Sequence, residues 1–362
     1  MKLFVDARYT RIGFHDGISR YTASLVTALK EIRESDQVDE LELTMIISDR
    51  RQLEMLPDLP WVKICSPTGP LEPCAALMLN KYRPDVVFSP MQTIGSLGRR
   101  FKLVLTLHDL IYYAHPTPPS FLPAPVRWGW RVFHRSYTPQ RILLNRADAV
   151  VTVSQTTAQL MSQHRLTRRP VHVIANAAPE GSIVDEAEAL NLLELRDRTL
   201  LYMGSFMPYK NVETLLEAMR QLPEYTLMLL SKAPHQRLTQ LRQMAGANVV
   251  FRQGVSDEEY RKLLQNSQAL MTASRDEGYG LPVVEAQAAG CPAIISDIPI
   301  FNEIAPHALH CPPDHPADFA AAVRSLEQRD YAQQIVRGGL KDASHFTWRE
   351  SARRLMQLAQ TL

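Results

Sequence analysis

Cysteine is scarce in this sequence, with four thiols scattered through 362 residues. Their spacing favours reduced, mostly buried thiols over a disulfide framework. Long apolar runs are also missing, and none approaches the roughly 20 residues that a membrane-spanning helix needs. The opening residues, MKLFVDAR, enter a predicted strand at once, without a charged leader and an apolar signal core. We therefore expect a cytoplasmic protein, with peripheral contact at the inner membrane face left open.

Several common motifs are missing as well. The sequence has no repeat of solenoid period, and its first glycine loop is not G-x-G-x-x-G, which excludes the dinucleotide fingerprint. Three histidines and one cysteine lie in a stretch broken by prolines, without recognisable ligand spacing: His307, His310, Cys311 and His315. The sequence therefore predicts no metal site there.

The charge is distributed unevenly along the chain. The formal net charge is +2, yet residues 1–175 have a balance of +7 and the remainder a balance of −5. Between Arg99 and Arg169 there are eleven basic residues against two acidic ones. A basic N-terminal half indicates an anionic partner on that side, and the cytoplasmic leaflet of a membrane is one candidate.

Short apolar segments alternate with amphipathic ones along most of the chain, and this alternation is typical of parallel α/β sheets. The length allows two domains, and we place the crossing between them in the polar connection at residues 178–195. Strands are expected at 3–7, 41–47, 85–89, 102–107, 147–153 and 171–174, and then at 200–203, 225–230, 249–251, 268–271 and 292–296.

The most informative stretch is Ser274–Asp297, which lies between two of these strands. Pro282 suits the first turn of a helix and Gly290 suits its end. The sequence therefore predicts strand, glycine-bearing loop, helix of about two turns, and strand. We expect the N–H groups of residues 281–284 to be free at the helix start, where they would form an anion site.

Two glutamates flank this helix start. Glu277 lies in the loop beside Gly278 and Gly280, which let a ligand approach the backbone, and Glu285 is expected in the first helical turn. Two acidic acceptors around an anion site suit a molecule with hydroxyls at both ends and a charged middle, such as a nucleotide-diphosphate sugar. In the alternative interpretation both glutamates are ordinary surface acids, but this leaves the adjacent glycines unexplained.

The run E-G-Y-G-L-P-V-V-E, followed by A-A-G-C-P, resembles the E-x7-E signature of retaining glycosyltransferase family 4, in its mannosyltransferase-like group. Nearly the whole chain shares the resemblance, which implies the GT-B fold: two Rossmann-like parallel-sheet domains that face each other across a cleft. Residues 1–175, with a crossover helix at about 346–362, would form the acceptor-side domain. Residues 176–345 would form the domain that binds the nucleotide sugar.

The resemblance also implies roles for individual residues. The catalytic residues would be His108, Glu277 and Lys210. Donor binding would involve Gly17, Gly204, Ser205, Lys210, Gly278, Tyr279, Gly280, Leu281 and Glu285. Lys210 stands at a strand-loop-helix turn where an ammonium group could meet a diphosphate, but Ser205 and Tyr209 occupy positions near which relatives have an arginine. For His108, a histidine held by a neighbouring backbone group is the equally weighted alternative.

Residues 125–146 allow two interpretations. Arg127, Arg131 and Arg135 recur every four residues, and Trp128 and Trp130 lie among them. These residues could meet anionic lipid or a phosphate-bearing acceptor. We favour the second interpretation, an amphipathic helix with its aromatic side chains in the core.

The resemblance thus implies a retaining, metal-independent transferase that needs no cofactor. It would move a hexose, with mannose favoured, to a glycan or lipid-linked acceptor in cell-envelope or polysaccharide synthesis. GDP-mannose is the favoured donor and a UDP-sugar the other; no nucleic acid is expected as a partner. No Asp-x-Asp occurs in the sequence, which agrees with metal independence. A non-catalytic nucleotide-sugar-binding scaffold and, less favoured, a nucleotide-sugar epimerase are the alternatives.

Overall fold

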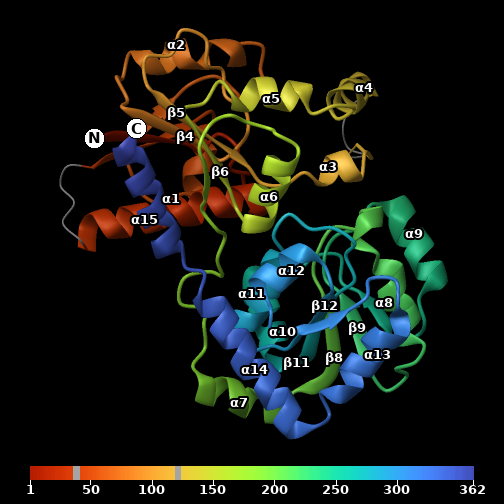
Figure 1. Ribbon diagram of the computed structural model, residues 1–362. Coiled ribbons are helices and arrows are strands. Elements are labelled where there is room, and N and C mark those ends of the chain that lie inside the picture. Colours follow the sequence, from red (N-terminus) through yellow and green to blue (C-terminus); the bar gives the residue numbers. More distant parts are fainter. Residues whose placement is uncertain (36–40, 119–123) are drawn as a thin grey trace. The chain divides into compact units, whose positions relative to one another are not determined.

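The computed structural model describes residues 1–35, 41–118 and 124–362. These residues form two units, each with its own parallel sheet (Figure 1). The first unit comprises Met1–Asn176 together with Thr347–Leu362, and the second comprises Ala177–Phe346. The chain therefore leaves the first unit, builds the second and returns to the first with its last helix.

The first unit contains a seven-stranded parallel sheet in the order β3-β2-β1-β4-β5-β6-β7. Several of its strands are buried along their whole length, as expected for a parallel sheet covered on both faces. Its strands are β1 (Lys2–Asp6), β2 (Glu42–Ile47), β3 (Trp61–Lys63), β4 (Val86–Ser89), β5 (Lys102–Leu107), β6 (Ala149–Thr152) and β7 (Val171–Val173). Its helices are α1 (Gly17–Ser35), α2 (Ala75–Asn80), α3 (Ile111–Ala114), α4 (Ala124–Phe133), α5 (Thr138–Leu144), α6 (Gln155–Gln163) and α15 (Trp348–Thr361), with short 3-10 turns η1 (Arg50–Met55) and η2 (Glu72–Cys74).

The second unit contains a six-stranded parallel sheet in the order β10-β9-β8-β11-β12-β13. Its strands are β8 (Asp197–Tyr202), β9 (Thr226–Leu229), β10 (Val249–Phe251), β11 (Ser267–Thr272), β12 (Ala293–Ser296) and β13 (Leu309–Cys311). Its helices are α7 (Glu186–Leu195), η3 (Pro208–Lys210), α8 (Val212–Met219), α9 (His235–Met244), α10 (Asp257–Asn266), α11 (Leu281–Ala288), α12 (Pro299–Ile304), α13 (Pro316–Ser325) and α14 (Arg329–Ser344).

The strand order fixes where a ligand can bind in each unit. In open parallel sheets, ligands bind outside the carboxyl ends of the strands, where the strand order reverses. The order reverses between β1 and β4 in the first sheet and between β8 and β11 in the second. The loops that follow these four strands are therefore the places to look for a site.

The last helix completes the first unit. In Figure 1, α15 (blue) crosses α1 (red), and the two helices are in contact. The rings of Tyr21 and Trp348 meet edge to face with centroids 5.7 Å apart, and both side chains are buried. The Ser351 hydroxyl donates to the carbonyl of Ala175, at 2.8 Å. A terminal helix in this unit was expected from the family resemblance.

Two features differ from the expected elements. The polar connection at 178–195 contains α7, whose first turn is capped by the Asp185 side chain. This helix is held because Ala189 packs against Val336 and Leu340 of α14. The strand β13 was not expected either. Its three residues pair with β12, and a segment that short has too little pattern to be recognised from sequence.

The helix α4 corrects the favoured interpretation of residues 125–146. None of its residues is buried, and Trp128 is 69% exposed. Only part of its aromatic side packs inward, where Trp130 meets Tyr112 edge to face with centroids 5.0 Å apart. The aromatic spacing suggested a core helix, but α4 contributes no fully buried side chain to the core of the first unit.

Candidate functional site

The loops after β8 and β11 meet at the switch point of the second sheet. The backbone N–H of Arg275, after β11, donates to the carbonyl of Tyr209, after β8, at 2.8 Å. Close by, the Lys210 ammonium group donates to Oε1 of Glu277. The side chains of Lys210 and Glu277 are only 14% and 12% exposed. Two predicted site residues, 67 positions apart in sequence, are thus brought into direct contact.

A serine that the sequence did not single out supports this pair. The Ser274 hydroxyl donates to the same Glu277 oxygen at 2.9 Å, and it lies 3.0 Å from the hydroxyl of Thr272 at the end of β11. Both serine and threonine are buried. Glu277 is therefore oriented by groups from its own loop as well as by Lys210. The sequence signal that could have identified Ser274 is its position, three residues before the first glutamate of the motif.

The start of α11 requires glycine at position 280. Gly280 has φ of +96°, in the left-handed region, and a Cβ there would lie 2.6 Å from a ring carbon of Phe301. Pro282 has no N–H, and the N–H groups of Val283 and Val284 both donate to the carbonyl of Gly280. Of the four residues 281–284, Leu281 alone keeps an N–H group that is not bonded within the helix. The N–H group of Gly280, directly before the helix, is not bonded within it either.

The position of Glu285 also needs correction. Gly280 is the N-cap of α11 and Leu281 its first residue, so Glu285 is the fifth helical residue and the first turn contains no acid. The helix nevertheless has the expected length of about two turns. It ends as expected at Gly290, which has φ of +68° and donates to the carbonyl of Gln287 at 3.0 Å. Glu285 therefore lies in the second turn of α11 and not in the first, where it was expected.

The other glycine-loop residues occupy different surroundings. The Gly204 N–H donates to the Ser231 hydroxyl at 3.1 Å. Ser205 is exposed, and its carbonyl accepts from the buried Tyr202 hydroxyl at 2.5 Å. Gly278 lies between Glu277 and Tyr279 in the loop. The Tyr279 ring faces inward, edge to face with Phe346, and burial raises its pKa well above the ordinary value.

Cations near the loop after β8 are already paired. Arg237 donates to the Phe206 carbonyl at 3.1 Å and to Glu213 at 2.6 Å. Arg275 donates to Asp314 through two nitrogens, at 2.9 and 2.5 Å. The sequence analysis singled out neither arginine, although Arg275 lies only two residues before Glu277. They are the arginines that the structure offers near the positions of Ser205 and Tyr209.

Asn211 stands directly before α8, at a position where an asparagine side chain often caps a helix. It adopts a left-handed conformation with φ of +52°, and its side chain accepts from no backbone N–H of α8, although its Oδ1 accepts from the Thr214 hydroxyl of that helix at 3.1 Å. Its amide instead donates to the carbonyl of Pro313 at 2.7 Å and to Asp314 at 3.2 Å. The side chain therefore joins the loop after β8 to the loop after β13.

In the first unit, His108 follows β5 and is held from two sides. Its Nε2 lies 2.8 Å from the Pro90 carbonyl, so this nitrogen carries the proton and donates. The ring meets that of Tyr21 edge to face at 5.2 Å. Burial lowers the pKa of His108, which favours the neutral ring. The backbone partner anticipated by the alternative interpretation is present, yet Nδ1 is left as an acceptor for a hydroxyl.

The loop between β1 and α1 is organised by a serine. The buried Ser19 hydroxyl accepts from the Arg11 N–H at 3.2 Å and lies 2.8 Å from the His15 ring nitrogen. Gly17 begins α1, and a Cβ there would meet no atom within 4 Å. Gly17 therefore borders open space. Its predicted contact with the donor stays a prediction.

A buried ion network at the carboxyl end of β1 was not predicted. The Arg8 side chain is fully buried and donates to Asp6 at 2.7 Å and to Glu72 at 2.6 Å. The two carboxylates raise the pKa of Arg8, against the opposing effect of burial. Glu72 also accepts from the N–H of Gly95 at 3.1 Å. This network connects the loops after β1 and β4, where the strand order reverses.

The three histidines near β13 each contact a different residue and do not share a ligand site. His307 lies 2.6 Å from Asp342, His310 lies 2.9 Å from the carbonyl of Ala305, and His315 lies 3.3 Å from Asp318. Over the described ranges 1–35, 41–118 and 124–362, no three His, Cys, Asp or Glu side chains are grouped as metal ligands. The same residues contain no helix long and apolar enough to span a membrane. The four cysteines are unpaired with one another.

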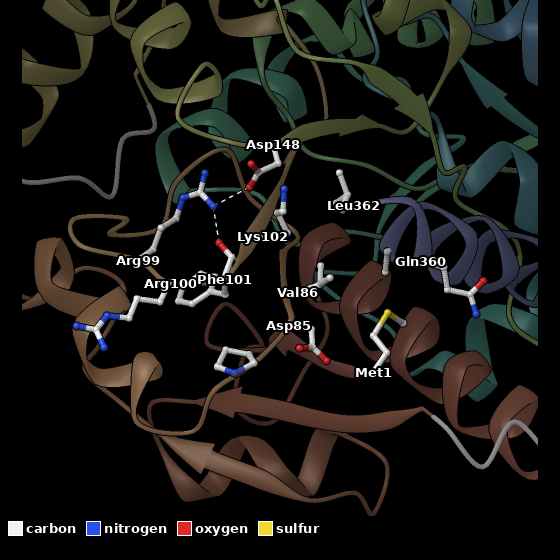
Figure 2. Close-up of a pocket in the computed structure, with 12 residues that line it drawn as sticks. Met1, Asp85, Val86, Arg99, Arg100, Phe101, Lys102, Asp148, Gln360 and Leu362 are labelled. Carbon is white, nitrogen blue, oxygen red and sulfur yellow. Dashed lines mark hydrogen bonds and ion pairs between the residues drawn. The ribbon is translucent and has the colours of Figure 1, made fainter.

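One cavity of the first unit lies away from all these residues. Figure 2 shows this cavity of about 690 Å³ at the amino ends of β1, β4 and β5. Its charges are largely satisfied: Arg99 donates to Asp148 at 2.6 Å, and Asp85 accepts from the N–H of Lys2 at 2.7 Å. The cavity is therefore on the edge of the sheet opposite the predicted site residues.

Comparisons with known proteins agree with this architecture. Residues 16–179 match the family model described as "Glycosyltransferase Family 4", and residues 185–342 match "Glycosyl transferases group 1". The O-antigen chain mannosyltransferase RfbU of Salmonella typhimurium (strain LT2) is 24% identical over 329 residues, which cover 86% of this chain and 87% of the relative.

A second relative and a solved structure extend the comparison. The GDP-mannose:cellobiosyl-diphosphopolyprenol alpha-mannosyltransferase of Xanthomonas oryzae pv. oryzae is 32% identical over 117 residues, which cover 30% of this chain and 31% of the relative. The structure of Alr3699/HepE from Anabaena, in complex with UDP and glucose, superposes with a TM-score of 0.73 at 18% identity, with all of both chains covered. This likeness shows the shared fold.

Proposed function

Because the chain belongs to the retaining glycosyltransferases of family 4, with the GT-B fold, we propose that it transfers mannose from GDP-mannose. The acceptor would be a glycan or a lipid-linked saccharide in cell-envelope polysaccharide synthesis. The names of two relatives support mannose, and one of them supports GDP-mannose. UDP in the solved relative keeps a UDP-sugar as the second donor to test.

The observation that carries this proposal is the contact between Lys210 and Glu277 at the switch point of the second sheet. Departure of the nucleotide leaves negative charge on its diphosphate, and preorganised cations and N–H groups stabilise such charge. Lys210 supplies an ammonium group for it. The N–H groups of Gly280 and Leu281, at the start of α11, supply dipoles.

In this proposal Lys210 exchanges partners when the donor binds. Without donor, the ammonium group is held by Glu277. A diphosphate offers more negative charge than one carboxylate, so Lys210 turns towards it and Glu277 is released to accept hydrogen bonds from the sugar hydroxyls. Glu285 accepts from the ribose hydroxyls, as acidic residues do in other nucleotide folds.

His108 has a positioning role in the proposal. Its proton is on the nitrogen that donates to Pro90, which leaves Nδ1 able to accept from a hydroxyl of the sugar or the acceptor. A neutral ring suits this role because it places no positive charge beside the developing oxocarbenium-like centre. Burial maintains that neutrality by lowering the pKa of His108.

The test is incubation with GDP-mannose, UDP-glucose and other nucleotide sugars, with and without saccharide acceptors. Release of GDP with formation of an α-mannosyl product, read by anomeric proton resonances, supports the proposal. Binding without turnover identifies a scaffold instead. An isomerised donor identifies an epimerase. Either of these two results rejects the proposal.

We propose in addition that α4 makes peripheral contact with a membrane. Val126, Trp128 and Val132 are 51%, 69% and 45% exposed, and Arg127 and Arg131 lie between them on the same helix. Exposed apolar and basic groups on one helix are typical of an interfacial segment. Sedimentation with phosphatidylglycerol vesicles tests this: Trp128→Ala with Arg131→Ala is expected to reduce binding, and unchanged binding rejects it.

A further inference from the structure

A second cavity of the first unit contains a concentration of arginines. It lies at the amino ends of β6 and β7 and has a volume of about 1140 Å³. Four of the eight residues that line it are arginines: Arg141, Arg165, Arg168 and Arg169. They come from the last turn of α5 and from the connection between α6 and β7. The carboxyl ends of the strands, which the proposed transfer reaction uses, are at the opposite edge of the sheet.

Two of these guanidinium groups are fixed by neutral atoms. Arg141 donates to the carbonyls of His164 and Arg165, at 2.7 and 3.1 Å. Arg169 donates through two nitrogens to the carbonyl of Asn145, at 3.2 and 3.0 Å. Carbonyl groups hold the side chains in place without cancelling their charge. The cavity is therefore preorganised and still cationic.

No carboxylate balances these charges in the part of the chain that the structure describes. The cavity lining contains no Asp or Glu, and none of the four arginines forms an ion pair with a described residue. The cavity in Figure 2 is different, because Arg99 there is paired with Asp148. Four like charges gathered without counter-charges repel one another, and an external anion would relieve that repulsion.

The backbone at Arg165 is unusual for an arginine. Arg165 has φ of +49°. The N–H of Arg165 donates to the carbonyl of Ser162 at 3.0 Å, and the N–H of Leu166 donates to the carbonyl of Met161 at 2.9 Å. This is the helix-ending motif in which glycine is the usual residue, because a Cβ is disfavoured there. The fold tolerates strain at the position that aims Arg165 at the cavity.

Helix ends offer a simpler explanation for part of this arrangement. Both α5 and α6 end at the cavity, and positive side chains are stabilised at helix C-termini. That effect favours one cation in the last turn of each helix. It does not explain Arg168 and Arg169, which lie beyond α6 and line the same cavity.

We propose that this cavity binds a phosphate-bearing anion with at least two negative charges. Guanidinium groups form paired hydrogen bonds that match phosphate oxygens, and the cavity is of a size that accepts a small molecule or a headgroup. The same chemistry could come from a soluble diphosphate or from the phosphomonoester headgroup of a lipid. The site does not depend on the proposed donor site.

The first test is calorimetric titration of the full chain with inorganic pyrophosphate. The Lys210→Ala background is used so that the proposed donor site does not dominate the signal. We expect Arg168→Ala with Arg169→Ala to weaken binding by about tenfold or more. The matched control is Arg50→Ala with Arg51→Ala, which removes two adjacent arginines after β2 and is expected to leave binding unchanged.

A second variant separates binding from folding. Arg165→Gly removes one cation and also relieves the backbone strain. We therefore expect weaker pyrophosphate binding with an unchanged or higher thermal midpoint in the absence of pyrophosphate. A soluble diphosphate is rejected as the ligand if Lys210→Ala protein does not bind pyrophosphate. It is also rejected if the arginine variants bind pyrophosphate as well as the control does.

Vesicles distinguish the two sources of phosphate. The same variants are sedimented with phosphatidylcholine vesicles that contain phosphatidic acid. If the arginine variants lose pyrophosphate binding and keep vesicle binding, the ligand is soluble. If they lose vesicle binding, with or without loss of pyrophosphate binding, the ligand is a lipid headgroup. If the arginine variants lose neither, the proposal is wrong.

Discussion

The ammonium group of Lys210 and the carboxylate of Glu277 are held together in the loops after the neighbouring strands β8 and β11, where the strand order of the second sheet reverses. Each side chain is mostly buried, and Ser274 gives the carboxylate a second hydrogen bond. A ligand anion could replace Glu277 as the partner of Lys210, and the Glu277 carboxylate could then accept other hydrogen bonds. The proposed donor supplies both functions, with a diphosphate for the one and sugar hydroxyls for the other.

Replacement of Lys210 by Ala should reduce kcat by about 10²–10³-fold, the range found when one preorganised group that stabilises developing charge is removed. Steady-state rates of nucleotide release measure this. Lys262→Ala is the control, because Lys262 pairs with Glu258 on the exposed face of α10 at 2.7 Å. If both variants retain the parent rate, Lys210 has no role in stabilising the leaving group.

Gly280→Ala is expected to lower the free energy of unfolding by about 2–4 kcal/mol, since it combines a left-handed backbone with a close contact to Phe301. Urea denaturation measures the change. Gly17→Ala serves for comparison, because a Cβ there meets no atom within 4 Å. A similarly small effect at both positions would contradict the steric explanation for Gly280.

The stability of the first unit should depend on the protonation of His108. Burial lowers the pKa of this residue below its ordinary value of 6.5, so protonation opposes folding. The contribution of neutral His108 to folding stability is fully present above pH 6.5. It is lost as the pH falls through the lower pKa of the folded state. The parent should therefore lose more stability than His108→Gln between pH 7 and pH 5. The free energy of unfolding of both proteins is measured by urea denaturation. If it falls equally in both as the pH is lowered, groups other than His108 cause the acid sensitivity.

Arg8→Ala is expected to destabilise the protein by about 3–5 kcal/mol, because it leaves the fully buried Asp6 and the partly buried Glu72 without their cation. Arg51→Ala breaks an exposed pair with Asp49, which the solvent screens, and should change the stability much less than Arg8→Ala. Thermal and urea unfolding compare the two. A mild effect of Arg8→Ala would mean that the buried carboxylates find other partners or become protonated.

Local sequence signals predicted much of the fold. The apolar run at β4 indicated a buried strand, and Gly290 lies just past the end of α11, as expected. Each of these features depends on residues within a few positions of one another. The strand and helix alternation, with the family resemblance, then led to two parallel sheets and the GT-B fold.

Contacts between distant residues were beyond the sequence analysis. Arg8 and Glu72 are 64 positions apart, and no local pattern connects them. The aromatic residues of α4 gave the wrong prediction because helical spacing alone does not show whether a neighbouring element covers that face. Glu285 was expected in the first helical turn, but with Leu281 as the first helical residue it is the fifth, just beyond a turn of about 3.6 residues.

The return of α15 to the first unit affects the order in which the protein can fold on the ribosome. Tyr21, near the beginning of the chain, packs on Trp348, near its end, whereas the second unit is complete once residue 346 is made. The second unit can therefore acquire its native packing first. The earlier-synthesised unit stays without the cover of α15 until Trp348–Thr361 have also been made.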